Sequence, residues 1–218
     1  MERGLEFLAL DLTHRCNLSC DFCGKLTKGE RFQITMTQLE RFCALCKDTP
    51  AKFIRVSGGE VTTHPQFRTM IEYILKEMAK PIELATNGIR LVEYEDMVPM
   101  FAKIHITEYP GVNDEAVQRF RRYPNVNIIT LQRIYDVALD PNWTVEQGQQ
   151  AYDHCCRAQI NVCNDKVYGC CMAETLERRG KLSSVHVKLA PGWVEAYRKL
   201  SCIEACRHCF IAATEGWA

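Results

Sequence analysis

The spacing of the cysteines constrains this chain more than any other feature. Thirteen of the 218 residues are cysteine, and most of them fall in three groups, over residues 16–23, 155–171 and 202–209. This share, about 6%, is well above ordinary usage and below the level of a disulfide scaffold. Grouped thiols in a reducing compartment indicate a metal or redox centre rather than disulfide bridges.

The compartment is inferred from the rest of the chain. Residues 1–6 carry acidic side chains and no apolar run long enough for a signal peptide, and no later segment is apolar enough to span a bilayer. We therefore expect a cytoplasmic protein with no membrane partner. The 27 basic and 27 acidic residues balance, so no overall field attracts nucleic acid and no nucleic-acid partner is expected.

Short apolar runs alternate with helical patterns up to about residue 135. The alternation predicts βαβ units and a mainly parallel sheet. Five or six such units fall short of the eight in a closed barrel. We expect an α/β fold, a partial (β/α) barrel of about five to six parallel strands. Strands are expected at 6–13, 52–57, 82–86, 103–107 and 127–131, and helices at 37–47, 66–80, 92–102 and 113–123, the first opened by the capping box Thr37-x-x-Glu40.

Beyond about residue 140 the alternation stops and the cysteines return among glycine and turn residues. A helix is expected over 194–211. We divide the chain into a barrel core, 1–139, and a small iron–sulfur-binding extension, 140–218, whose own core is too thin to stand without a metal.

The first cysteine group follows the first predicted strand with the spacing Cys16-x3-Cys20-x2-Cys23. Three thiolates can hold three irons of a [4Fe–4S] cluster and leave the fourth iron open for a ligand. Zinc bound by the same cysteines, with His14 as fourth ligand, is the alternative.

A second motif, Ser57-Gly58-Gly59-Glu60, ends the second predicted strand. In parallel sheets, ligands bind at the carboxyl ends of the strands, so this motif and the cysteine loop belong to the same edge. The two glycines let the backbone approach a ligand closely, and Glu60 offers an anion for an ammonium group.

Together these motifs resemble the signature of the radical S-adenosylmethionine (SAM) superfamily, in which an aromatic residue, here Phe22, precedes the last cysteine. The resemblance implies that Cys16, Cys20 and Cys23 bind a [4Fe–4S] cluster that chelates SAM. It further implies that SAM is cleaved reductively to a 5′-deoxyadenosyl radical, which abstracts hydrogen from a substrate. An external one-electron reductant, such as flavodoxin or ferredoxin, is then required.

Two further segments resemble parts of this SAM site. Thr86-Asn87-Gly88 is similar to the TNG segment after the third strand of related enzymes, and Thr107 stands where relatives often place a hydroxyl that touches SAM. A simple turn and a β-branched strand residue are the respective alternatives.

The later cysteines resemble a Twitch or SPASM extension, and the number of cysteines favours the single-cluster Twitch form. The resemblance implies a second, auxiliary [4Fe–4S] cluster, with a structural zinc as the alternative. Cys163 and Cys202 are surplus in this scheme. The implied ligands are Cys155 or Cys156, then Cys170, Cys206 and Cys209.

Three remaining residues are assigned to the core or the sheet. Cys43 and Cys46 lie on the apolar stripe of the predicted helix 37–47 and are expected to be core thiols. His105 is expected to be an ordinary sheet histidine.

Three functions compete. The favoured one is dehydrogenation of a small polar metabolite, sugar-like or cyclitol-like. Peptide crosslinking or epimerisation is second, because peptide-modifying relatives often add a leader-binding domain whereas the first strand here begins near residue 6. A non-catalytic, metal-stabilised binding module would leave the Gly-Gly-Glu motif without a purpose. Glu108, Tyr109 and Arg133, after the later strands, are candidates to orient a substrate hydroxyl or take its proton.

Overall fold

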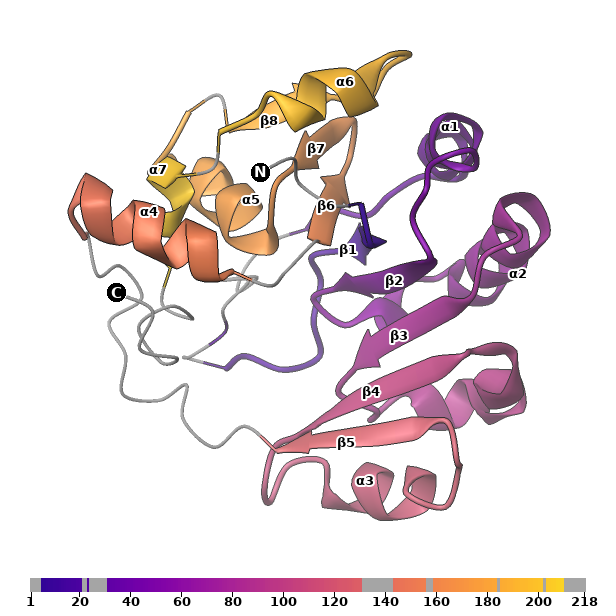
Figure 1. Ribbon diagram of the computed structural model, residues 1–218. Helices are drawn as coiled ribbons and strands as arrows, with labels where there is room; N and C mark the ends of the chain where they lie inside the picture. The colour runs from indigo at the N-terminus through magenta and orange to yellow at the C-terminus, as the bar shows by residue number, and fades with distance from the viewer. Residues whose placement is uncertain are drawn as a thin grey trace.

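A curved sheet organises the part of the chain that the structure describes. The computed structural model describes residues 5–20, 23, 31–130, 143–155, 159–183, 185–201 and 203–209. Its strands follow the order β5-β4-β3-β2-β1-β6-β7-β8 across one sheet (Figure 1). The strands are β1 (Phe7–Thr13), β2 (Phe53–Gly58), β3 (Ile82–Thr86), β4 (Lys103–Glu108), β5 (Val126–Thr130), β6 (Gln159–Cys163), β7 (Lys166–Tyr168) and β8 (His186–Lys188).

Strands β1 to β6 pair in parallel, whereas β7 and β8 add an antiparallel end. The predicted mainly parallel α/β sheet is thereby confirmed. β6 lies beside β1, with Phe7 paired to Gln159 and Leu10 to Val162. The proposed division at residue 139 thus separates two chain segments that share one sheet.

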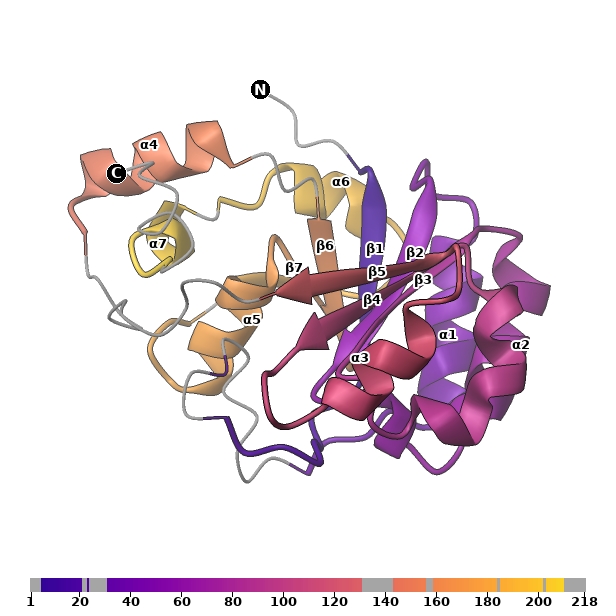
Figure 2. The ribbon, with the colours of Figure 1, turned by 90° about the horizontal axis from the view of Figure 1, so that it is seen from below.

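Helices cover both faces of this sheet. Figures 1 and 2 show α1, α2 and α3 on one side, and α4, α5 and α7 on the other. The helices are α1 (Met36–Cys46), α2 (Phe67–Met78), α3 (Asp114–Phe120), α4 (Val145–His154), α5 (Cys171–Arg178), α6 (Trp193–Arg198) and α7 (Ile203–Cys206), with the 3-10 helices η1 (Val61–Thr63) and η2 (Leu91–Met100).

Alternation along the strands decides which face each side chain occupies. Leu8, Leu10 and Leu12 of β1 are fully buried in the core with Leu39 of α1 and Ile71 of α2. Because successive strand residues point to opposite faces, the residues between these leucines face away from α1 and α2. We call this other face, on the side of α5, the inner face.

The predicted start of the first helix and its capping box are wrong. Helix α1 begins at Met36, and its capping box is Thr35 with Gln38 rather than Thr37 with Glu40. The backbone of Thr35 is extended (φ −90°, ψ 162°), as an N-cap requires. Ile34, just before it, donates to the carbonyl of Leu12 at 2.9 Å, so the chain leaves the sheet region only at this point.

Two further helix predictions also need correction. The segment expected as a helix over 92–102 is the 3-10 helix η2, which is interrupted at Tyr94. It also contains Pro99, and a proline has no amide hydrogen to donate to a regular helix. The helix expected over 194–211 is split into α6 and α7. Within the described residues, no helix has the length and apolar composition that crossing a membrane demands.

Candidate active site

The end of β2 lies directly against the loop that follows β1. Gly59 donates its backbone N–H to the carbonyl of Thr13 at 2.7 Å, and Glu60 donates to that of Arg15 at 2.8 Å. A Cβ on Gly58 would stand 2.1 Å from the Thr13 oxygen, and one on Gly59 would stand 2.3 Å from the Arg15 oxygen. The segment placed against the glycines is therefore the protein's own loop, which leads directly into Cys16.

The carboxylate of Glu60 is the hub of this edge. It is 1% exposed. One oxygen accepts hydrogen bonds from the Thr62 N–H and hydroxyl and from the Thr86 hydroxyl, at 2.6–3.1 Å, and the other accepts from the Asn87 N–H at 2.6 Å. A carboxylate has about four lone-pair positions, so the second oxygen keeps one for a further donor.

Asn87 joins the third strand end to the cysteine loop. Its side-chain amide donates to Oδ1 of Asn17 at 2.7 Å. Asn17 follows Cys16, whose Sγ accepts the N–H of Leu18 at 3.4 Å. The Thr86-Asn87 segment is therefore tied both to Glu60 and to the loop of the first cysteine.

Asn113 is a central residue that the sequence analysis missed. It is 2% exposed, and its side-chain N–H group donates to the carbonyls of Asn87 at 2.7 Å and Thr107 at 2.8 Å. Its side-chain oxygen accepts the N–H of Tyr109 at 2.7 Å. Sequence places Asn113 at a helix start, where a side-chain cap is the ordinary expectation, but its side chain links the ends of β3 and β4 instead.

The three cysteines of the first motif are suitable ligands for an iron–sulfur cluster, which thiolates hold. Cys16, Cys20 and Cys23 are each half-buried. Burial raises the pKa of the Cys16 thiol to about 11. A hydrogen bond from the Leu18 N–H lowers this pKa, and the nearby Glu60, Cys23 and Cys20 raise it further. Converging thiols of this kind are deprotonated by a bound cation, so this donor set suits an iron–sulfur cluster.

Tyr109 lies next to this motif. Burial, followed by the nearby thiols of Cys20, Cys23 and Cys16, raises the pKa of its hydroxyl well above the usual value. The hydroxyl therefore keeps its proton at neutral pH and can donate a hydrogen bond. Glu108 is half-buried and accepts the Thr130 hydroxyl at 2.6 Å.

Two other predicted SAM contacts are placed as follows. The Ser57 hydroxyl donates to Oδ1 of Asp11 at 2.8 Å. Thr107 is half-buried in β4, and its carbonyl accepts from Asn113. Phe22, Arg133 and Cys156 lie outside the described residues.

The later cysteines occupy neighbouring elements around α5 and α7. Cys155 follows α4, and Cys170 precedes α5, where its sulfur accepts the N–H of Ala173 at 3.3 Å. Cys206 is buried against Ala151 of α4, with Cys209 packed beside them. Cys170 and Ala205 of α7 contact a common apolar cluster, so the described candidate ligands lie on elements that pack together.

Other predicted residues have clear outcomes. Cys43 and Cys46 are buried in the core, as predicted. His105 places Nε2 3.2 Å from Glu83, while its buried Nδ1 has no partner among the described residues. His14, the alternative fourth zinc ligand of the first motif, directs Nε2 toward Cys163 at 3.5 Å.

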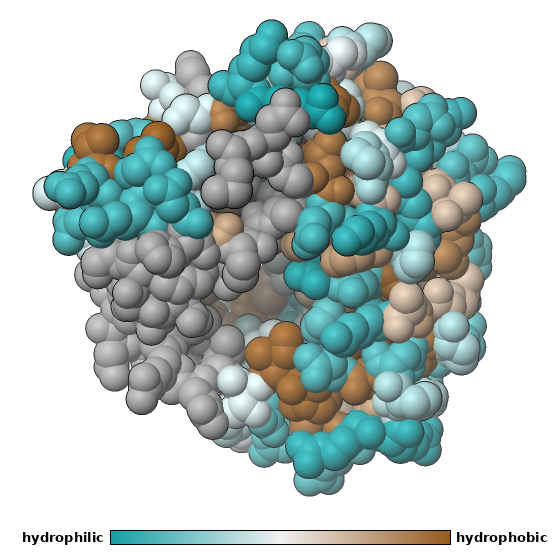
Figure 3. Space-filling view, in the orientation of Figure 1, coloured by the Kyte–Doolittle hydropathy of each residue, from teal (hydrophilic) through white to brown (hydrophobic). Residues whose placement is uncertain are grey.

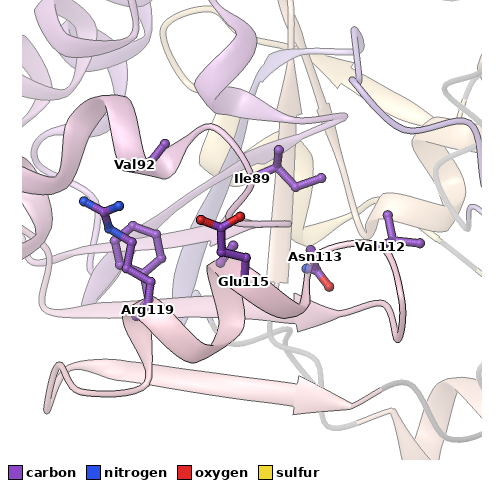
Figure 4. A pocket seen from close by; sticks show the side chains of 8 residues that line it. Ile89, Val92, Val112, Asn113, Glu115 and Arg119 are labelled. Carbon is purple, nitrogen blue, oxygen red and sulfur yellow. The ribbon is translucent and has the colours of Figure 1, made fainter.

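Two hollows mark the surface. In the orientation of Figure 1 the molecule is hollowed near its centre (Figure 3). A separate pocket of about 160 Å³ lies between η2 and α3. Figure 4 shows Val92, Glu115 and Arg119 at this pocket, and no cysteine is among its described lining residues.

Comparison with known proteins identifies the family. Residues 10–168 match the profile of the Radical SAM superfamily. The chain belongs to the radical SAM superfamily. It is therefore an enzyme of the kind that binds a [4Fe–4S] cluster and SAM and needs a reductant, and the first cysteine motif and the Gly-Gly-Glu segment lie inside the matched residues.

Relatives match this radical SAM chain over limited stretches. It is 32% identical over 99 residues to the GTP 3′,8-cyclase of Aquifex aeolicus (strain VF5), which covers 43% of this chain and 31% of that protein. It is 29% identical over 79 residues to the antilisterial bacteriocin subtilosin biosynthesis protein AlbA of Bacillus subtilis (strain 168), covering 36% and 17%. The chain thus spans about a third or less of the length of these curated relatives.

Solved structures share the fold over nearly the whole radical SAM chain. BtrN in an open conformation superposes with a TM-score of 0.60 at 12% identity, covering 96% of this chain and 87% of that one. SuiB of Streptococcus suis gives a TM-score of 0.51 at 12% identity, covering 92% and 67%. At this identity, the likeness speaks for the fold alone.

Proposed function

We propose that this radical SAM enzyme is an oxidoreductase that dehydrogenates a small polar metabolite, sugar-like or cyclitol-like. Its partial barrel holds SAM at the edge built around Glu60, and its C-terminal segment holds an auxiliary [4Fe–4S] cluster. When bound, the first cluster and SAM supply reductive SAM cleavage and abstraction of a hydrogen atom from the substrate. Flavodoxin or ferredoxin is the proposed one-electron donor.

The polar inner face of the sheet carries this proposal. Arg55 donates to Glu83 at 2.5 Å, and His105 lies 3.2 Å from the same carboxylate oxygen. These three side chains stand on β2, β3 and β4 and are between 14% and 30% exposed. A substrate with several hydroxyl groups needs such partners when it leaves water.

Oxidation of an alcohol to a carbonyl removes one hydrogen atom, one proton and one electron from the substrate. The SAM-dependent step removes the hydrogen atom. The proton and the electron must then each have an acceptor. Glu108 is the proposed proton acceptor, because it is a half-buried carboxylate at the end of β4 and carboxylates can act as general bases. Tyr109, which keeps its proton, is proposed to orient the substrate oxygen, and Arg133 remains a further candidate for that role.

The auxiliary cluster is the proposed electron acceptor. Its proposed ligands are Cys155 or Cys156, Cys170, Cys206 and Cys209. The packing of Cys206 and Cys209 against α4 and the position of Cys170 at the start of α5 support this set. Four thiolates complete a [4Fe–4S] site.

The test compares the parent with the Cys206→Ala/Cys209→Ala variant under anaerobic conditions. Substrates deuterated on carbon, drawn from sugars, aminocyclitols and short peptides, are scored by deuterium transfer into 5′-deoxyadenosine. We expect transfer from a polyol, and we expect the variant to lose about half of its iron and all oxidised product while SAM cleavage continues. Cys43→Ser, a core thiol on the other face, is the matched control.

Two outcomes would contradict the proposal. Deuterium transfer from a peptide alone would favour peptide modification, and the local similarity with the bacteriocin biosynthesis protein AlbA is consistent with that alternative. Substrate conversion at the parent rate without the second cluster would exclude the electron-acceptor role, and a product at the oxidation level of the substrate would favour a redox-neutral reaction such as epimerisation.

A further inference from the structure

Four buried side chains that the proposed chemistry does not use meet on the inner face. They are Asp11 of β1, His14 of the following loop, Cys163 at the end of β6 and Glu174 of α5. None is more than 8% exposed. The elements that carry them are far apart in the sequence and belong to both parts of the chain.

The distances converge on one nitrogen. Nε2 of His14 lies 3.5 Å from Sγ of Cys163, 3.6 Å from Oε1 of Glu174 and 3.9 Å from Oδ2 of Asp11. The ligand atoms of Asp11, His14 and Cys163 all lie within 4.8 Å of one another. Two carboxylates, a thiol and an imidazole therefore share one small buried volume.

Hydrogen bonding accounts for the 3.5 Å contact with the sulfur of Cys163 but not for the distances to the two carboxylates. A proton on the imidazole nitrogen would bring one oxygen to about 2.7–3.2 Å, but both carboxylates remain beyond 3.5 Å. In a tetrahedral zinc site, bonds of about 2.0–2.3 Å hold neighbouring ligand atoms roughly 3.3–3.8 Å apart. The separations of 3.5 and 3.6 Å from His14 Nε2 lie within this range, and the separation of 3.9 Å from Asp11 lies just above it.

The surrounding groups hold these side chains in place. Ser57 and the side-chain amide of Asn161 donate to the two oxygens of Asp11, at 2.8 and 3.3 Å. Arg178 donates to Glu174 at 3.0 Å. Outer partners of this kind orient ligands in metal sites, and the arginine with a dication would balance three anionic ligands.

The imidazole is buried, and its polar contacts lie on one side of the ring. The His14 ring is 2% exposed and packs against Phe32 at 4.9 Å between ring centroids. Its Nδ1 is buried without a hydrogen-bond partner among the described residues. Burial of a polar ring is costly unless a strong interaction offsets it, and only Nε2 faces candidate ligand groups.

We propose that Asp11, His14 and Cys163, with Glu174 as the fourth ligand, bind a divalent cation of the zinc class. A site closed by four protein ligands is structural rather than catalytic. Its ion would join β1 to β6 and α5, and so fasten the C-terminal segment to the barrel. The inference is independent of the proposed reaction and substrate.

The test measures zinc and iron together in anaerobically purified full-length protein grown with added zinc. The parent should carry about one zinc per chain besides its iron, and X-ray absorption at the zinc edge should show one sulfur and three nitrogen or oxygen ligands. Cys163→Ser and His14→Gln should lose the zinc and keep the iron. Cys43→Ser, which changes another buried thiol but one in α1, should keep both.

Glu174→Gln keeps the side-chain volume and serves where the other variants do not fold. It should lower zinc affinity at least tenfold in competition with a chelator. Absence of zinc from the parent, or a zinc shell made only of sulfur, overturns the proposal. A sulfur-only shell that disappears in the Cys16, Cys20 and Cys23 alanine variant would identify the ion as misplaced zinc in the cluster motif.

Discussion

The Glu60 carboxylate accepts a hydrogen bond of 2.6 Å from the backbone nitrogen of Asn87. This bond joins the end of β2 to the end of β3. Asn87 in turn donates to Asn17 in the cysteine loop, so a single carboxylate controls the relative position of three strand ends. These bonds show that Glu60 orders the site, and we propose that its remaining lone pair receives the SAM ammonium.

Glu60→Gln should weaken SAM binding without loss of iron. The substitution places an amide donor against the donors of Thr86 or Asn87, and it removes the charge offered to the ammonium. Loss of one charge-assisted hydrogen bond costs about 1.5–3 kcal/mol, or roughly tenfold to a hundredfold in affinity. Equilibrium binding of SAM to the cluster-loaded protein measures this, with the exposed Glu40→Gln as control. Unchanged affinity would show that the carboxylate has no part in the SAM site.

Gly59→Ala should disrupt the cluster loop more than Gly111→Ala. The added methyl group at 59 would stand 2.3 Å from a backbone oxygen, whereas at 111 nothing lies within 4 Å and only the positive φ of 75° opposes it. A left-handed non-glycine residue costs about 1–3 kcal/mol, so Gly111→Ala reports that cost alone. We expect the Gly59 variant to bind less iron at the first motif as well as to unfold at lower urea concentration. Equal iron content in both variants would contradict the contact with Arg15.

Asn113→Ala should reduce SAM binding although the side-chain hydrogen bonds of Asn113 run to Asn87, Thr107 and Tyr109. It removes three buried hydrogen bonds that connect Asn87, Thr107 and Tyr109. Unsatisfied buried groups cost about 1–3 kcal/mol each, so we expect a clear loss of stability in urea unfolding. Asn113→Asp keeps the acceptor for Tyr109 but places an anion against two carbonyls, and it should not rescue binding. Rescue by aspartate would mean that the two donated bonds are unimportant.

The protein should lose stability as the pH falls below about 6.5. Burial lowers the pKa of His105 and of His64 from their usual value of 6.5. The unfolded chain then binds protons near pH 6.5 that the folded chain takes up only at lower pH, so acid favours unfolding. The slope is at most about 1.4 kcal/mol per pH unit for each histidine. Urea unfolding between pH 7.5 and 5.5 should show a shallower slope in the His64→Gln/His105→Gln variant. An unchanged slope would exclude these two histidines as its source.

Local patterns in the sequence determined much of this protein. The cysteine spacing and the Gly-Gly-Glu segment identify the superfamily without any coordinates, because three thiolates and a close backbone approach are requirements of short segments. The first five strands are likewise predicted, since alternation and β-branched residues are local signals. The burial of Cys43 and Cys46 follows from the same helical periodicity.

Tertiary structure alone decided how these segments meet. Nothing local in the sequence shows that β6 pairs with β1, because parallel pairing over some 150 residues leaves no periodic trace. That pairing places Cys163 beside Asp11 and His14. The pairing of β3 with β4 likewise places Asn113 beside Asn87. The sequence analysis did not single out Asp11 or Asn113, because each becomes important only when the fold buries it beside partners that its polar atoms require.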